Sequence, residues 1–185
     1  MGTIILLLIV GAVIAAVLLY NGLITLQNQV QNAWRQIDLQ LKRRHDLIPN
    51  LVETVKGAMQ FERETLERVM QARSRAVSAV SVPDKAAAEN ELGQSLGRLF
   101  AVMENYPQLK TTENVLKLQE ELTTTENQIT FARQFYNDSV MQLNTRQQTF
   151  PGNMIAGFFN FRPAEYFQGS PDDQQLPRVD LSLPK

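Results

Sequence analysis

The chain has 185 residues, with 18 basic and 19 acidic side chains, one histidine and no cysteine. A net charge of −1 gives no electrostatic footprint for nucleic acid, so nucleic acid is not an expected partner. The lack of cysteine excludes disulfides, thiolate metal sites and cysteine nucleophiles. The length leaves room for one domain besides a membrane anchor.

The first stretch of the chain is apolar. Residues 3–19 contain no charge and no proline, and with Tyr20 they would form a helix of about 27 Å, close to the hydrocarbon thickness of about 30 Å. A cleaved signal peptide is the alternative, but no basic residue precedes the stretch, which is longer than a usual signal core. We therefore expect residues 1–20 to be a transmembrane anchor, represented by Ile4, Leu8, Val13, Leu18 and Tyr20.

Four helices are predicted after the anchor, because apolar residues recur at helical spacing over 21–58, from Gly57 to about Val80, over 83–105 and over 110–148. Pro49 removes a hydrogen bond to the carbonyl of His45, which predicts a kink rather than a break. Ser81 and Asp84 resemble a capping box. The short connections predict an all-α, up-down-up-down bundle over 21–148, with two long and two short helices and a coiled-coil-like heptad in the fourth.

The part of this bundle nearest the membrane has only the two long helices, since the short pair covers the far end. Two helices cannot bury many large apolar groups between them. We therefore expect lateral homo-oligomerisation through the apolar residues of this part, namely Leu23, Leu26, Val30, Trp34, Phe131, Phe135 and Val140.

The last part of the chain, residues 149–185, is rich in aromatic residues and then in proline, and its last 18 residues are expected to be loosely ordered. The fourth helix descends toward the membrane, so this tail begins at the base of the bundle. Its aromatic residues can form a belt at the membrane interface, cover the exposed helices or bind a partner. They include Phe150, Phe158, Phe159, Phe161 and Phe167.

Charged residues on the long helices predict ion pairs that set the register of the bundle. Antiparallel pairing places Arg44 opposite Glu120, Glu121 or Glu126, and Asp38 near Arg133. On this basis Arg44→Ala lowers stability, and a charge exchange with Glu126 partly restores it. The alternative is a lipid-binding patch, although it would lie far from the anchor. The register set is Asp38, Arg43, Arg44, Asp46, Pro49, Glu126 and Arg133.

Catalytic chemistry has little support in the sequence. A di-iron bundle site needs two Glu-x-x-His motifs, whereas His45 is the single histidine and is preceded by Lys42 at that spacing. The chain has no glycine-rich phosphate loop. We expect His45 to be structural, and we expect no catalytic, metal or cofactor site. The many Asn and Gln residues of the long helices are expected on solvated faces, or in hydrogen bonds between subunits.

Several long motifs resemble the LemA family over nearly the whole chain. Gln60-Phe61-Glu62 departs from the family, which often has His-Glu there. The matching motifs are Tyr20-Asn21-x-Leu23, Trp34-x-x-Ile37-Asp38-x-Gln40-Leu41-x-Arg43-Arg44-x-Asp46-Leu47-Ile48-Pro49-Asn50-Leu51-Val52, Glu104-Asn105-Tyr106-Pro107-x-Leu109-Lys110, Thr125-Glu126-Asn127, Tyr136-Asn137-x-x-Val140 and Pro151-x-Asn153.

This resemblance implies a bacterial single-pass membrane protein with a helical domain and no established enzymatic activity. One family member takes part in forming magnetosome membranes. We expect an inner-membrane location, with the domain in the cytoplasm because the basic residues nearest the anchor, from Arg35 onward, follow it. The leading hypothesis is a non-enzymatic scaffold whose partners are the bilayer and further copies of itself. The alternative is an adaptor that docks a membrane enzyme or transporter, as yet unknown, through its aromatic tail.

Overall fold

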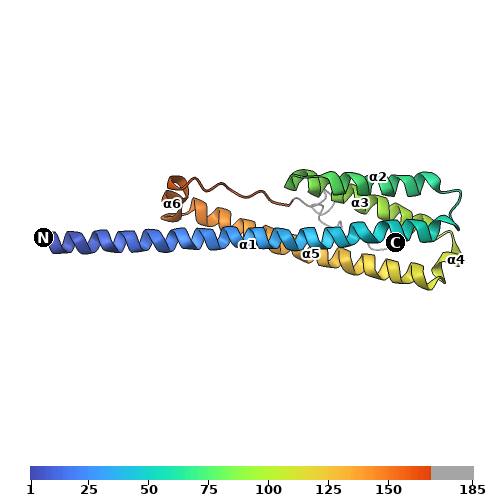
Figure 1. Ribbon diagram of the computed structural model, residues 1–185, viewed down its shortest axis with the longest axis horizontal. Coiled ribbons are helices and arrows are strands. Elements are labelled where there is room, and N and C mark those ends of the chain that lie inside the picture. Colours follow the sequence, from blue (N-terminus) through green and yellow to red (C-terminus); the bar gives the residue numbers. More distant parts are fainter. Residues whose placement is uncertain (168–185) are drawn as a thin grey trace, which may run out of the picture.

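The computed structural model describes residues 1–167, and all regular structure in that range is helical. This confirms the prediction of an all-α chain that begins with a long apolar helix. The two longest helices, α1 and α5, lie side by side in opposite directions, and the α2–α3 hairpin covers the end away from the N-terminus (Figure 1). The helices are α1 (Gly2–Lys56), α2 (Arg63–Ser78), α3 (Val82–Met103), α4 (Pro107–Lys110), α5 (Glu113–Gln148) and α6 (Gly152–Phe158).

Helix α1 is continuous over 55 residues and ends before Gly57. Its N-terminal part projects beyond the rest of the molecule (Figure 1). Among the described residues it is the one helix long and apolar enough to cross a membrane. The expected anchor residues Ile4, Leu8, Val13 and Leu18 are all exposed.

Pro49 lies inside α1 without ending the helix, and a side chain from α2 satisfies the carbonyl that it leaves free. Proline has no N–H to donate to the carbonyl four residues earlier, here that of His45. Arg73 Nε donates to this carbonyl oxygen over 2.6 Å. The hydrogen bond therefore restores the missing partner of α1 and at the same time ties α2 to it.

The α2–α3 hairpin is shorter than the sequence predicts. Helix α2 begins at Arg63, because the chain forms turns after Gly57, and it ends at Ser78 rather than near Val80. Ser81 caps α3 as expected: the Asp84 N–H donates to Ser81 Oγ over 3.1 Å. A short additional helix, α4, separates α3 from α5, so α5 begins at Glu113 rather than near residue 110.

The core consists of two clusters of buried apolar residues along the α1–α5 pair. The membrane-distal cluster lies under the α2–α3 hairpin and contains Ile48, Leu51, Val55, Val69, Leu92, Leu99 and Leu122, among others. The membrane-proximal cluster lies mainly between α1 and α5 and contains Leu23, Val30, Ile37, Ile129, Val140, Leu143 and Phe167, among others.

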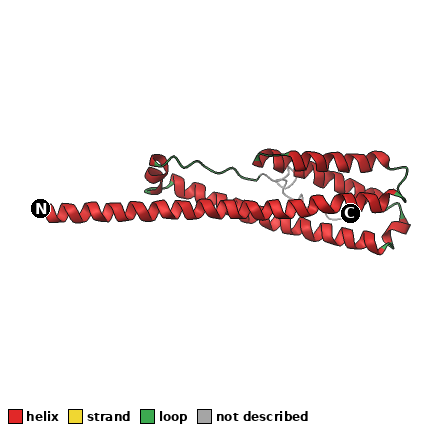
Figure 2. Cartoon of the chain, in the orientation of Figure 1, coloured by secondary structure: helices red, strands yellow, loops and turns green. Residues whose placement is uncertain are grey.

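The chain turns back toward this proximal cluster after α5, through an element that the sequence did not predict. Helix α6 packs on both α1 and α5, and Gly152 at its start has no room for a Cβ, which would lie 2.3 Å from the Arg146 carbonyl oxygen. Asn160, with φ of 55°, then reverses the chain, and the Phe161 N–H donates to the Ala156 oxygen over 2.9 Å. Residues 161–167 follow as an extended segment without helix (Figure 2). The expected loose order of the last 18 residues concerns a stretch outside the described residues.

The Arg73–His45 hydrogen bond can be tested against Pro49. Arg73→Met should lower the free energy of unfolding by about 1–3 kcal/mol, because it leaves the His45 carbonyl without a partner. In a Pro49→Ala background the alanine N–H can donate to that carbonyl, so the same substitution should cost less. Urea titrations of the full chain in detergent measure this coupling.

The matched control is Arg75→Met, which removes an exposed pair with Glu91 and should cost below about 1 kcal/mol in either background. An equal cost of Arg73→Met with and without Pro49 would show that the proline does not create the need for Arg73.

Candidate functional site

A buried ion cluster joins three helices between the two core clusters. Arg44 of α1 contacts the carboxylates of Glu89 in α3 and Glu126 in α5, through Nη2 and Nη1 respectively. His45 Nε2 lies 2.7 Å from Glu89 Oε1. Arg44 and Glu89 are fully buried, whereas the Glu126 side chain is 47% exposed.

Glu89 is therefore the main partner of Arg44, and sequence reasoning overlooked it. Arg44 does face Glu126, one of the three glutamates that the sequence places opposite it. The charge exchange Arg44→Glu with Glu126→Arg would put a second carboxylate beside Glu89. In contrast to the prediction from the sequence, this exchange should not restore stability. The overlooked signal is that Glu89 shares the apolar stripe of α3, between buried Ala86 and buried Leu92.

The electrostatics of Glu89 follow from its buried partners. Burial alone would raise the pKa of this carboxyl group, because the charged form loses water. The hydrogen bond with His45 and the charge of Arg44 outweigh this effect, so its pKa lies below the ordinary 4.5. Glu89 consequently remains ionised in the folded protein and compensates the buried Arg44 charge.

His45 is engaged on both its ring and its backbone. Its Nε2 contacts Glu89 and its carbonyl accepts from Arg73, so it links α1 to both helices of the hairpin. A cavity of about 330 Å³ beside the cluster is lined by Arg44 and Glu126 together with apolar and small polar residues. Within residues 1–167, no group of three or more His, Cys, Asp or Glu residues could hold a metal ion. The arrangement is that of an ion network that joins helices.

The other predicted register residues have different roles. Asp38 pairs with α3: its Oδ1 accepts from Lys85 Nζ over 2.6 Å. Arg133 stacks on the Phe167 ring, with its guanidinium carbon 4.7 Å from the ring centroid. Arg43 and Asp46 are exposed on α1.

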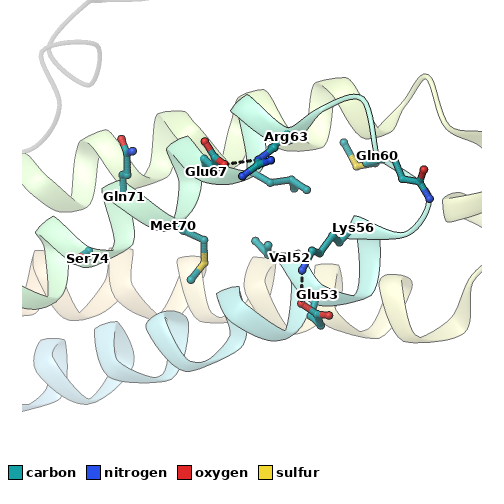
Figure 3. A pocket seen from close by; sticks show the side chains of 11 residues that line it. Val52, Glu53, Lys56, Gln60, Arg63, Glu67, Met70, Gln71 and Ser74 are labelled. Atoms are coloured by element: carbon teal, nitrogen blue, oxygen red, sulfur yellow. Dashed lines mark hydrogen bonds and ion pairs between the residues drawn. The ribbon is translucent and has the colours of Figure 1, made fainter.

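An apolar groove at the membrane-distal end lies between the end of α1 and α2, with a volume of about 810 Å³ (Figure 3). Val52, Met59, Leu66 and Met70 supply its apolar lining. Its rim carries two exposed ion pairs, Lys56–Glu53 at 3.6 Å and Arg63–Glu67 at 2.7 Å. The lining offers apolar contact, and its charged groups are already paired with each other.

The predicted oligomer interface is mostly buried within one chain. Leu23, Val30 and Val140 are buried between α1, α5 and the returning tail, while Leu26 and Trp34 are partly buried against the same cluster. Helices α1 and α5 do not bury these large apolar residues alone. Helix α6 and residues 161–167 of the same chain supply the additional cover. Phe131 and Phe135 alone of the predicted set remain exposed.

The returning segment is held by two asparagines of α5. The side-chain amide of Asn144 donates to the Ala164 oxygen and accepts from the Ala164 N–H, each over 2.9 Å. Asn137 makes the same pair of bonds with Phe167, at 3.0 and 2.9 Å. Seven helical residues rise about 10.5 Å and three extended residues span about 10 Å, so the two spacings match. We call Asn137 and Asn144 the asparagine clamp.

The clamp places Phe167 in the core. Its ring is buried, 6.1 Å from Trp34, and Tyr136 Oη donates to the neighbouring Glu165 carbonyl over 2.8 Å. Burial raises the pKa of Tyr136 above its usual 10.0, with a smaller effect from the Glu165 charge. The predicted tail aromatics thus divide into two groups: Phe161 and Phe167 are covered, while Phe150, Phe158 and Phe159 are exposed.

An exposed apolar surface remains on α1 and α5 above the membrane anchor. It consists of Leu39, Phe131 and Phe135, with exposed fractions of 65%, 71% and 43%, and we call it the assembly surface. A cavity of about 480 Å³ is lined by these three side chains with Ala132 and glutamines of both helices. The three side chains come from two neighbouring helices, and an exposed apolar patch of this kind is a candidate protein contact.

The asparagine clamp gives a testable prediction. Asn137→Ala should release residues 161–167 and speed amide hydrogen exchange there, because both Phe167 backbone groups lose their partners. Asn28→Ala, on the exposed face of α1, is the control and should leave this exchange unchanged. Slow exchange at the Phe167 amide in the Asn137→Ala variant would contradict the role of the clamp.

The ion cluster predicts unequal effects of its two glutamates. Glu89→Gln should lower the free energy of unfolding by about 3 kcal/mol, since it leaves Arg44 without a buried counter-charge. Glu126→Gln, at a half-exposed position, should cost at most about 1 kcal/mol. Equal costs in denaturant titrations would contradict the assignment of Glu89 as the main partner.

The same cluster predicts a dependence on pH. Because the pKa of Glu89 is lower in the folded than in the unfolded chain, its contribution is complete above pH 4.5 and is lost as the pH falls through the folded value. The wild-type protein should therefore lose more stability than Glu89→Gln when acidified below pH 4.5.

Comparison of the sequence with known proteins places this chain in a family. The family model described as "LemA family" matches residues 33–181. The chain is 29% identical to Protein LemA of Metamycoplasma hominis over 163 residues, covering 87% of this chain and 72% of that protein. It is 26% identical over 189 residues to Magnetosome protein MamQ 2 of Paramagnetospirillum magneticum, covering 88% and 70%. Magnetosome protein MamQ of Magnetospirillum gryphiswaldense is 22% identical over 178 residues, covering 82% and 65%. With its apolar anchor helix and its match over most of the sequence, this membrane-anchored chain belongs to the LemA family.

Proposed function

We propose that this protein is a non-enzymatic scaffold of the bacterial inner membrane, which assembles laterally with copies of itself and organises the membrane or its proteins. The observation that carries the proposal is the assembly surface of Leu39, Phe131 and Phe135. It spans both long helices, and its large side chains are exposed although the rest of the predicted apolar set is covered.

The continuous α1 helix favours lateral contact between copies. Leu39 lies about 28 Å along the helix from Tyr20, so every anchored copy presents its assembly surface at a similar height above the bilayer. Anchoring also confines the copies to two dimensions, which raises their effective concentration. A small surface that is weak in solution can therefore support association at the membrane.

The relatives support a role in membrane organisation by analogy. Two of them are called magnetosome proteins, and their similarity extends over most of this chain. Similarity of fold does not by itself transfer a function, so the analogy adds to the assembly surface and does not replace it.

An adaptor that docks a membrane enzyme or transporter through its aromatic tail has less support. Phe161 and Phe167, two of the aromatics that such docking would use, already pack within the chain. Phe167 is buried and the asparagine clamp holds its backbone.

Substitution of the assembly surface tests the scaffold. Phe131→Glu with Phe135→Glu should shift cross-linked and native-mass-spectrometry populations from oligomers to monomers, because it places charges where copies would meet. Phe61→Glu makes the same change at a residue that is 95% exposed beyond the end of α1, and it should leave the oligomers unchanged.

A wild-type protein that is monomeric both in mild detergent and in vesicles would contradict lateral assembly. A stoichiometric foreign partner, recovered equally with wild type and the double variant, would favour the adaptor.

A further inference from the structure

The protein has a second apolar surface at the point where α1 passes from exposed to buried. Along α1, Leu18 is 66% exposed, Tyr20 is partly covered, and Leu23 is fully buried. The boundary between the apolar anchor and the folded domain therefore lies between Leu18 and Leu23. A helix crossing a bilayer with its apolar part would have the membrane surface at this level.

Helix α6 lies at the same level. The Tyr20 ring is 4.7 Å from the ring of Phe159 and 5.8 Å from that of Phe161, measured between centroids. Helix α6 contacts both α1 and α5, so it is held beside the end of the anchor (Figure 1).

The outward side of this region is apolar. Ala156 and Gly152 face the long helices and are buried, whereas Met154 and Phe158 are exposed, Phe158 to 80%. Phe150, just before α6, is also exposed. Water would be a poor environment for three such side chains on one short segment.

The charges around α6 indicate what covers it. Residues 147–161 contain no charged side chain, and exposed arginines, Arg146 and Arg162, stand at the two ends of this stretch. An uncharged aromatic segment with basic flanks suits the membrane interface, where aromatic rings lie at headgroup depth and arginines reach lipid phosphates.

We propose that α6, with Phe150, Met154 and Phe158, is a lipid-binding element that inserts into the interface of the bilayer spanned by α1. The anchor and α6 then contact the membrane at two points, which fix the rotation of the domain about the α1 axis. This inference rests on the membrane anchor and not on the lateral assembly proposed above, so the two can fail separately.

The test uses tryptophan fluorescence of the full chain in phosphatidylcholine–phosphatidylglycerol vesicles. Trp34 is the single natural tryptophan, so Trp34→Phe provides a silent background. Phe158→Trp in this background reports on α6, and Phe61→Trp is the matched control at the distal end of the molecule. Circular dichroism checks that both variants retain the helical content of the background.

We expect blue-shifted emission from the tryptophan at position 158, with a loss of intensity when the lipids carry bromine near the headgroup and a smaller loss with bromine deep in the acyl chains. The control at position 61 should show neither effect. Emission from position 158 that bromine does not quench would overturn the proposal, and a blue shift without quenching would identify a protein contact there instead.

Stronger quenching by the deep bromine would overturn the interfacial position. Met154→Trp, on the same exposed side of α6, repeats the measurement if Phe158→Trp alters the fold. The oligomer-disrupting pair Phe131→Glu and Phe135→Glu should leave the quenching unchanged, which separates lipid contact from lateral assembly.

Discussion

The continuity of α1 is the constraint on which the rest of the structure depends. One helix is apolar and exposed at its start and has one buried face over the rest of its length, so its helical phase decides which residues meet the other helices. Leu23, Val30 and Ile37 recur at heptad spacing and place α5 along one side. Arg44, Ile48 and Leu51 continue the buried face under the α2–α3 hairpin.

Maintaining this continuity requires polar partners from other helices. Pro49 interrupts the backbone ladder of α1, and Arg73 supplies the missing donor to the His45 carbonyl. One turn away, Arg44 is buried with its charge and needs the carboxylate of Glu89. Both connections lead to the hairpin, so the hairpin is joined to α1 by polar contacts as well as by the distal apolar cluster.

The sequence predicted what depends on local periodicity, namely the helical class, the long anchor helix and the Ser81 cap. It did not predict Glu89 as the partner of Arg44, because a glutamate within a helical pattern is usually solvated and only packing makes this one buried. Cover of the exposed helices was one of the three alternatives for the aromatic tail, and Phe161 and Phe167 pack in this way. The sequence did not predict the path of residues 161–167, since a non-helical segment carries no periodic signal. The overlooked signal is the seven-residue spacing of Asn137 and Asn144. Both asparagines belong to the polar residues that were expected on solvated faces or in hydrogen bonds between subunits.

The returning tail changes how the exposed surfaces relate to one another. Because residues 161–167 close the proximal groove, only Phe131 and Phe135 of the predicted interface remain exposed, and they form the assembly surface together with Leu39. Helix α6 is fixed to the same two helices that carry this surface. If α6 lies in the membrane interface as proposed, rotation of the domain about α1 would withdraw it from lipid. The assembly surface would then point in one direction relative to the bilayer, and neighbouring copies would meet in a defined orientation.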